Sequence, residues 1–317
     1  RSGVIRSSAR SALQSVSHTP YARRTASSHL IDLLCTRLCR YACHASDMIE
    51  QRFISRRSWV HAYACLVLLV GWTLPGGAVA SHWQTYVGEA TDLDSGEWRY
   101  RERHWVQYAP SLSQRLVVYE CADGRPFARK WLDYRRSPLA PDFVLQDQGQ
   151  GTVEGAILTT ERASSFRLEA DGSARVHTMP AEAIDLIDAG FDVWIASRWA
   201  DLIDGEAQRI PLLIPSRGES YEFAVQRRDL SADTPTEHVL LQARLANWFG
   251  FWLPKIEVTY RQTDRWLTRF EGPTNLRGAD NRPLNVRIEF PELPKDASAK
   301  DWMDAFSQPL QACQRPS

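Results

Sequence analysis

Two stretches of this sequence place arginine beside glutamate close to predicted turns, a combination suited to binding an anion. A guanidinium presents forked N–H donors to a carboxylate or phosphate, and a neighbouring carboxylate can hold it in place. The residues that offer this chemistry are Arg217 with Glu219, and Arg269 and Arg277 with Glu271. Structural ion pairing at strand ends uses the same residue types, so the sequence leaves both interpretations open.

Tryptophan is the second candidate for a functional role, because ten tryptophans follow residue 80. Large rings can form the wall of an apolar cavity, and they can equally fill the space inside a curved sheet. The predicted ligand-binding residues are Phe191, Trp194, Trp199, Trp248 and Trp252 as the wall of a cavity, Arg217 or Arg269 at its mouth, and Tyr221 and Glu271.

No short motif in the sequence identifies a reaction. The G-x-S-x-G elbow, the H-E-x-x-H zinc motif, the Walker loop and the G-x-G-x-x-G fingerprint are all missing. Four histidines follow residue 80, none within four residues of another: His82, His104, His177 and His238. His104 shares a strand face with Tyr100 and Val106, so it is the one expected to point inward. We therefore predict no catalytic residue, no metal site and no cofactor.

Residues 48–80 have the organisation of a secretory signal peptide. Basic residues precede an apolar run at 62–74, and small residues end the segment at Ala80. The pair Arg56-Arg57 leaves twin-arginine export open beside the general route. We predict cleavage after Ala80 and a periplasmic protein, with residues 1–47 forming a disordered or non-native leader.

The net charge of the predicted mature part disfavours two classes of partner, nucleic acids and anionic lipid surfaces. Residues 81–317 carry 28 basic and 35 acidic side chains, which gives a net charge of −7. Nucleic-acid binding needs a basic stripe to contact phosphates, so no nucleic-acid partner is expected. The apolar run at 62–74 is shorter than the about 20 residues of a membrane-spanning helix, and no span is predicted in the mature form.

From residue 81 onward, apolar and polar residues alternate with the period of strands buried on one face. The turn sequences Asp94-Ser95-Gly96, Asp123-Gly124 and Asp171-Gly172 separate such runs, and glycine tolerates the positive φ that a tight hairpin requires. About ten antiparallel strands in sequential order predict a mainly β fold. Because a broad open sheet leaves adhesive edges, we expect the meander to curl into a barrel or half-barrel over 81–317 as a single domain.

Two segments break the two-residue period and predict helices. Apolar residues recur every three to four positions over about 184–203, which predicts one helix, or a short and a long helix that meet near Gly190. Gly205 follows as the residue beyond the helix end. Ser298 and Asp301 have the spacing of a capping box, and an apolar face follows them to about 299–312. The first helix is expected to cover or plug the sheet, leaving a cavity between the two.

Cys121 and Cys313 are the two cysteines of the predicted mature part. An oxidising compartment favours their pairing, which would tie the C-terminal segment to an early strand. Two unpaired buried thiols are the alternative.

Five stretches carry a resemblance to a known group of proteins. They are GEATDLDSGEWRYRERH, RKWLDYRRSPLAPDF, DAGFDVWIASRWADLI, LLIPSRGESYEF and TRFEGPTNLR. Together they resemble an uncharacterised family of secreted proteobacterial proteins over nearly all of residues 84–290, which implies no known activity. The expected architecture is loosely similar to the half-barrels of periplasmic lipoprotein carriers, which hold acyl chains against an apolar concave face.

The predicted function is that of a periplasmic binding or carrier protein for an apolar or amphipathic envelope molecule, a lipid or lipidated ligand. An envelope hydrolase with catalytic residues dispersed over several strands is one alternative. A scaffold that binds another envelope protein through a sheet edge is the other.

Overall fold

The computed structural model describes residues 81–230, 235–246 and 255–313. The predicted leader 1–47, the predicted signal peptide 48–80, and the predicted wall residues Trp248 and Trp252 lie outside the described residues.

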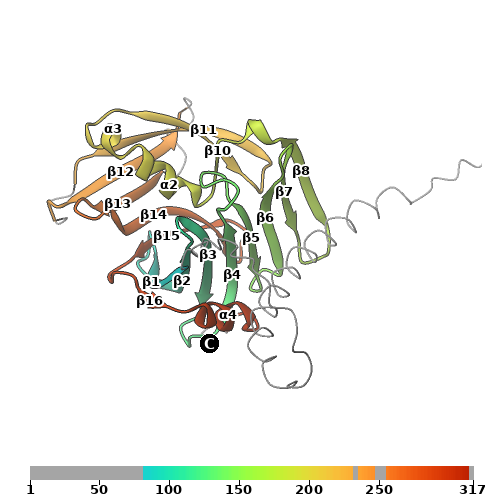
Figure 1. Cartoon of the computed structure of the whole chain (residues 1–317). Coiled ribbons are helices and arrows are strands. Elements are labelled where there is room, and N and C mark those ends of the chain that lie inside the picture. The colour runs from blue at the N-terminus through green and yellow to red at the C-terminus, as the bar shows by residue number, and fades with distance from the viewer. Residues whose placement is uncertain (1–80, 231–234, 247–254, 314–317) are drawn as a thin grey trace, which may run out of the picture. The chain divides into compact units, whose positions relative to one another are not determined.

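One large sheet contains two antiparallel meanders (Figure 1). The first comprises β1 (His82–Asp92), β2 (Trp98–Tyr108), β3 (Leu112–Glu120), β4 (Pro126–Asp133), β5 (Asp142–Asp147), β6 (Thr152–Leu158), β7 (Arg162–Leu168) and β8 (Ala174–Pro180). The second comprises β10 (Gln208–Ile214), β11 (Glu219–Arg228), β12 (His238–Leu245), β13 (Ile256–Arg261), β14 (Trp266–Arg277) and β15 (Pro283–Glu289). Two short strands complete the sheet, β9 (Leu186–Ile187) parallel to β10 and β16 (Lys295–Ala297) antiparallel to β1.

The two meanders join where β1 pairs with β15, in the register Glu89 with Glu289 to Asp92 with Val286. The hairpins predicted from the turn sequences are confirmed, because β1 pairs with β2, β3 with β4, and β7 with β8. The described residues form 16 strands where the sequence predicted about ten. β5 and β6 account for part of the difference, since both of their faces are largely buried and their sequences do not alternate.

The sheet is not closed, so the predicted complete barrel is wrong. Its hydrogen-bonded order begins at β8 and ends at β9, which follow each other in the chain but do not pair. Closure would require a strand long enough to pair with β8, whereas β9 has only two residues and lies parallel to β10. A 3₁₀ turn, η1 (Ala181–Ala183), connects the two edges.

The predicted helix 184–203 is shorter than expected and consists of two parts, α2 (Gly190–Ser197) and α3 (Trp199–Ile203). Leu186 and Ile187 form β9 because their backbone pairs with β10. Gly190 then begins α2 directly against the neighbouring loop, where a Cβ would lie 1.9 Å from the Leu139 carbonyl oxygen. Gly205 follows α3 with φ +91°, as predicted for the residue beyond the helix end.

The C-terminal helix α4 (Ala299–Ser307) begins with the predicted capping box, in which the Ser298 side chain accepts from the Asp301 N–H and the Asp301 carboxylate accepts from the Ser298 N–H. It ends five residues earlier than expected, because Gln308 precedes Pro309 and adopts extended backbone. The following residues reach the first meander, where Cys313 forms the predicted disulfide with Cys121.

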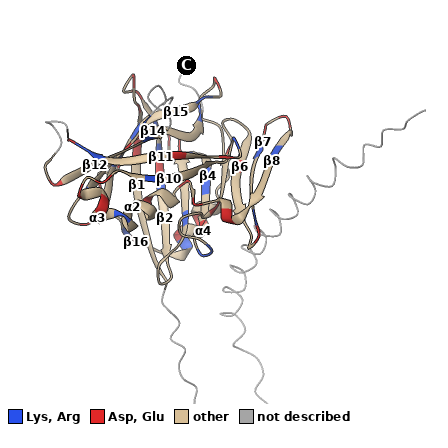
Figure 2. Ribbon diagram, turned by 90° about the horizontal axis from the view of Figure 1, so that it is seen from above, with Lys and Arg blue, Asp and Glu red and all other residues tan. Residues whose placement is uncertain are grey.

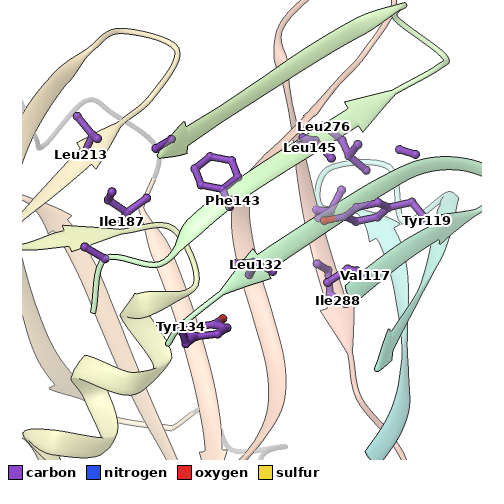
Figure 3. Packing of buried hydrophobic residues seen from close by; sticks show 14 of the residues in the cluster. Val117, Tyr119, Leu132, Tyr134, Phe143, Leu145, Ile187, Leu213, Leu276 and Ile288 are labelled. Carbon is purple, nitrogen blue, oxygen red and sulfur yellow. The ribbon is translucent and has the colours of Figure 1, made fainter. Parts of the chain in front are cut away.

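Two hydrophobic clusters form the core. The larger one lies mainly on the first meander and its junction with the second, and Figure 3 shows it around Phe143, Leu132 and Tyr119. The smaller one lies between the two helices and β11–β13, where Trp194 and Leu202 pack with Val225, Leu241 and Val258. The helices therefore cover one face of the second meander, and the candidate site lies beside them.

Positions of Lys and Arg and positions of Asp and Glu are interspersed along the described strands (Figure 2). None of the described helices is long and apolar enough to cross a membrane.

Candidate functional site

A pocket of about 140 Å³ lies where α2 and α3 meet the sheet. Its walls come from both meanders and from the helices. The aromatic lining consists of Tyr86, Trp199, Tyr260, Trp266 and Phe290, the charged lining of Arg115, Asp192 and Arg265, and the aliphatic lining of Ile195, Ala196 and Leu267.

Tyr86 on β1 is at the centre of the aromatic wall. Its ring stacks on His104 of the adjacent strand, with centroids 4.3 Å apart and planes inclined by 11°. Trp266 and Phe290 present their rings at steep angles to it, with centroids 5.0 Å and 5.9 Å away. Since edge-to-face arrangements are favourable between aromatic rings, this group forms a firm apolar surface.

Trp199 and Tyr260 form the helix side of the pocket. Their rings meet edge to face with centroids 5.7 Å apart, and both side chains are buried. Position 199 begins α3 and position 260 lies on β13, so this contact fixes the second helix against the sheet.

Asp192, in the first turn of α2, connects the helix to two strands. Its carboxylate accepts a hydrogen bond of 3.0 Å from the Tyr260 hydroxyl, and its other oxygen lies 3.5 Å from Nη1 of Arg115. A carboxylate in the first turn of a helix is also favoured by the helix dipole. Burial raises the pKa of Tyr260, and the charge of Asp192 raises it further, so this hydroxyl is protonated at neutral pH.

Arg115 on β3 places its guanidinium inside the pocket, with only 13% of its side chain exposed. Burial alone lowers the pKa of Arg115, but the surrounding oxygen groups of Tyr134, Tyr86 and Asp192 outweigh burial and raise the pKa. The guanidinium is therefore charged, and it also lies over the Tyr134 ring at 5.9 Å.

Arg265 is at the exposed edge of the pocket. It occupies the turn between β13 and β14 with φ +56°, and its guanidinium lies 5.4 Å from the centroid of Trp199. Asp264, the adjacent carboxylate, is paired with Arg261 at 2.6 Å. Among the described residues no carboxylate lies within ion-pairing distance of Arg265.

His104 and Glu102 lie behind Tyr86, both buried, with Nε2 of His104 2.9 Å from the Glu102 carboxylate. Burial lowers the pKa of His104, and the attraction of Glu102 offsets only part of this effect. A neutral imidazole is then expected to donate from Nε2 to Glu102. His104 supports the pocket wall from behind and does not line the pocket.

The predicted wall residues that the structure describes occupy different environments. Trp199 lines the pocket. Trp194 is buried in the smaller core cluster, where Phe191 stacks on it with centroids 6.0 Å apart.

The predicted polar residues lie away from the pocket. Arg217 donates to the Tyr221 hydroxyl at 3.3 Å, and Tyr221 donates to Glu219 at 2.8 Å. Arg269 pairs with Glu289 at 2.9 Å, and Glu271 accepts from Arg287 at 2.7 Å. These contacts are cross-strand and turn pairs, as in the alternative in which these residues form structural ion pairs at strand ends.

Of the residues that line the pocket, Trp199 alone was among the predicted ligand-binding residues. The missed residues include four with polar groups that matter for its chemistry: Arg115, Asp192, Tyr260 and Arg265. Each belongs to a different element, and no spacing along the chain relates them. Arg115 gives little local signal either, because it follows Ser113 and Gln114 and directly precedes the apolar run 116–119.

A second polar cluster crosses the first meander. Arg167 donates to Glu154 at 2.7 Å, and Asn275 donates to the same carboxylate at 3.3 Å. Lys130 lies 3.1 Å from Asn275 and 2.8 Å from Asp188. Because these charges are paired, the cluster is a structural network. No group of His, Cys, Asp or Glu among the described residues has the arrangement of a metal site.

Comparison with protein-family models and with curated proteins finds no match to this sequence.

Proposed function

We propose that this protein binds a small molecule, or one group of a larger amphipathic molecule, in the pocket beside α2 and α3. The aromatic lining around Tyr86 and Trp199 is the observation that carries this proposal. Concave, largely apolar sites with a few convergent polar groups are the usual form of small-molecule sites.

The size of the pocket favours a ring-sized apolar group over a whole acyl chain. Its volume of about 140 Å³ is close to that of an apolar cavity of about 150 Å³ that binds benzene. Sites for drug-sized molecules are larger, at about 300–1,000 Å³. A lipid would therefore bind through a terminal or head-group portion.

A curled sheet is part of this proposal, because curling would bring the helices and both meanders around one ligand. The contact between Gly218 and His177 supports it. A Cβ on Gly218, in the β10–β11 turn, would lie 2.1 Å from the His177 ring on β8. This turn therefore packs against the strand at the far end of the sheet order.

We place the proposed binding protein in the periplasm, after cleavage at Ala80. Two features support this location: the organisation of residues 48–80, and the disulfide between Cys121 and Cys313, a bond typical of oxidising compartments.

A steric block tests the proposal. Ala196 lines the pocket and is exposed, so Ala196→Phe should fill the space without disturbing the core. Ala200, exposed on α3 and not part of the lining, provides the matched control Ala200→Phe. Titration calorimetry with benzoate, benzamide, hexanoate and hexanamide should show saturable binding to wild type and Ala200→Phe, and at least tenfold weaker binding to Ala196→Phe.

Absence of saturable binding by all four compounds would refute the proposal. Equal affinities of Ala196→Phe and Ala200→Phe would place any binding elsewhere. Native mass spectrometry of protein from a periplasmic extract complements the titration, since a retained mass would identify the ligand.

A further inference from the structure

We infer that the pocket selects a small carboxylate. The apolar body of this ligand lies against the aromatic wall, and its anionic group binds Arg115 together with Arg265, which is near the mouth. This inference rests on the proposed function and adds the chemical class of the ligand. It follows from the polar groups of the pocket that still need partners.

Arg115 has unused donors facing a confined space. Within the described part of the chain its guanidinium makes no hydrogen bond, and its closest charged contact is the 3.5 Å approach to Asp192. Its Nε is buried without an acceptor. A buried donor without a partner is costly, so a bound acceptor would stabilise the site.

Asp192 does not offer an equivalent unused acceptor. One carboxylate oxygen accepts from Tyr260, and the other faces Arg115. Trp266 adds a further donor, since its indole N–H is buried with no acceptor among the described residues. The unfilled hydrogen-bonding capacity of the pocket is thus mainly that of donors, and it requires acceptors from a ligand.

The net charge of the lining also favours a ligand that carries acceptors and a negative charge. Two guanidinium groups and one carboxylate line the pocket, which leaves one positive charge in excess. Glu102 lies outside the lining and contacts His104. A ligand with one carboxylate would neutralise the excess, and a guanidinium can bind a carboxylate through two parallel hydrogen bonds.

A cationic ligand is the competing class, because aromatic walls attract cations. Here the face of Trp199 is already occupied by Arg265 at 5.4 Å. A ligand ammonium group would also meet Arg115 in the confined space. The observations therefore favour an anion.

Matched pairs of ligands test the inference without relying on a mutation. Benzoate and benzamide share a ring, and hexanoate and hexanamide share a chain, so each pair differs only in charge. At pH 7 and low salt, calorimetry should show, for at least one of the two pairs, that the acid binds at least tenfold more tightly than its amide. The cation benzyltrimethylammonium should bind more weakly than the acid and the amide of that pair.

Variants assign the effect to residues. Arg115→Met should reduce acid affinity by at least tenfold and change amide affinity by less than threefold. Arg265→Gln should reduce acid affinity by a smaller factor. The control Arg217→Gln removes an arginine that also lies over a ring, that of Tyr221 at 5.7 Å, but outside the pocket. It should have no effect.

Amides that bind as tightly as their acids would overturn the inference and leave the proposed function standing. Tighter binding of the ammonium compound would overturn it in favour of an aromatic cation site. Failure of both acids and both amides to bind would remove the proposed function together with the inference. If Arg115→Met does not fold, Arg115→Lys replaces it, and a retained preference for acids over amides supports the inference. Loss of this preference in Arg265→Gln but not in the Arg115 variant contradicts the role of Arg115.

Discussion

Lys130 on β4 and Asp188, just before α2, form a buried ion pair in which Nζ lies 2.8 Å from each carboxylate oxygen. Less than a tenth of either side chain is exposed. The same carboxylate accepts from the backbone N–H of Ala189, while Asp188 itself has φ +45°. This pair therefore fixes the backbone that leads into α2 and, through it, the position of Asp192.

Removing one member of this pair should be strongly destabilising. Lys130→Met leaves the Asp188 carboxylate buried without its cation, and we expect the free energy of unfolding to fall by about 3–5 kcal/mol. Urea denaturation measures the change. The double variant Lys130→Met/Asp188→Asn should recover part of the loss, because no charge is then left unpaired. Arg282→Met, which breaks an exposed pair with Asp280, is the control and should cost less than about 1 kcal/mol. Similar losses in the two single variants would contradict a structural role for the buried pair.

The disulfide should contribute substantially to stability. It joins positions 192 residues apart, so reduction frees a long loop in the unfolded chain. Cys121→Ser/Cys313→Ser is expected to lower the free energy of unfolding by about 2–5 kcal/mol. Urea denaturation of wild type with a reductant should reproduce this value, and the double variant should not respond to reductant. An unfolding midpoint that is the same for wild type with and without reductant would rule out this contribution.

The hydroxyl of Tyr260 should matter more for stability than that of Tyr134. Tyr260 donates to the Asp192 carboxylate, whereas the Tyr134 hydroxyl is buried with no hydrogen-bond partner among the described residues. Tyr260→Phe should cost about 1.5–3 kcal/mol, the range for hydrogen bonds to charged groups. Tyr134→Phe should be close to neutral in the same chemical denaturation. The prediction fails if the two substitutions have equal effects.

His104 should make stability dependent on mildly acidic pH. Because burial lowers its pKa below 6.5 in the folded protein, the unfolded chain binds the proton more readily as pH falls. The free energy of unfolding should therefore decrease below about pH 6.5, by at most about 1.4 kcal/mol for each pH unit, and this decrease ends once pH has passed below the folded pKa. Above pH 6.5 the imidazole is neutral in both states and contributes no slope. Denaturation at pH 5 to 8 should show a weaker dependence for His104→Gln than for His82→Gln, a substitution at an exposed histidine. Parallel profiles for the two variants would show that His104 is not responsible.

The sequence predicted the hairpins because their signals are local. Asp123-Gly124 and Asp171-Gly172 specify tight turns whatever the rest of the chain does, and the capping box of Ser298 is equally local. The junction of the two meanders had no such signal. Val286 and Ile288 alternate as any strand would, and nothing in their spacing selects β1 as a partner.

The candidate site was less predictable than the fold for the same reason. Trp199 was identified because a tryptophan on an apolar helix face is conspicuous. Arg115 and Tyr260 acquire their roles only when β3 and β13 are brought to opposite sides of Asp192, which depends on the long-range pairing. Arg217 and Arg269 looked equally suitable in the sequence, yet their partners are residues of neighbouring strands or of their own turn.

The central position of β1 determines the order in which the molecule can be completed during synthesis. Its pairing with β2 is available almost at once, whereas Glu89 must wait for Glu289, which the ribosome adds 200 residues later. Until then one side of β1 presents unsatisfied backbone groups to other nascent chains, a known route to aggregation. A translation product that stops before residue 283 lacks β15, so this side of β1 never gains its β15 partner and the exposed strand edge persists.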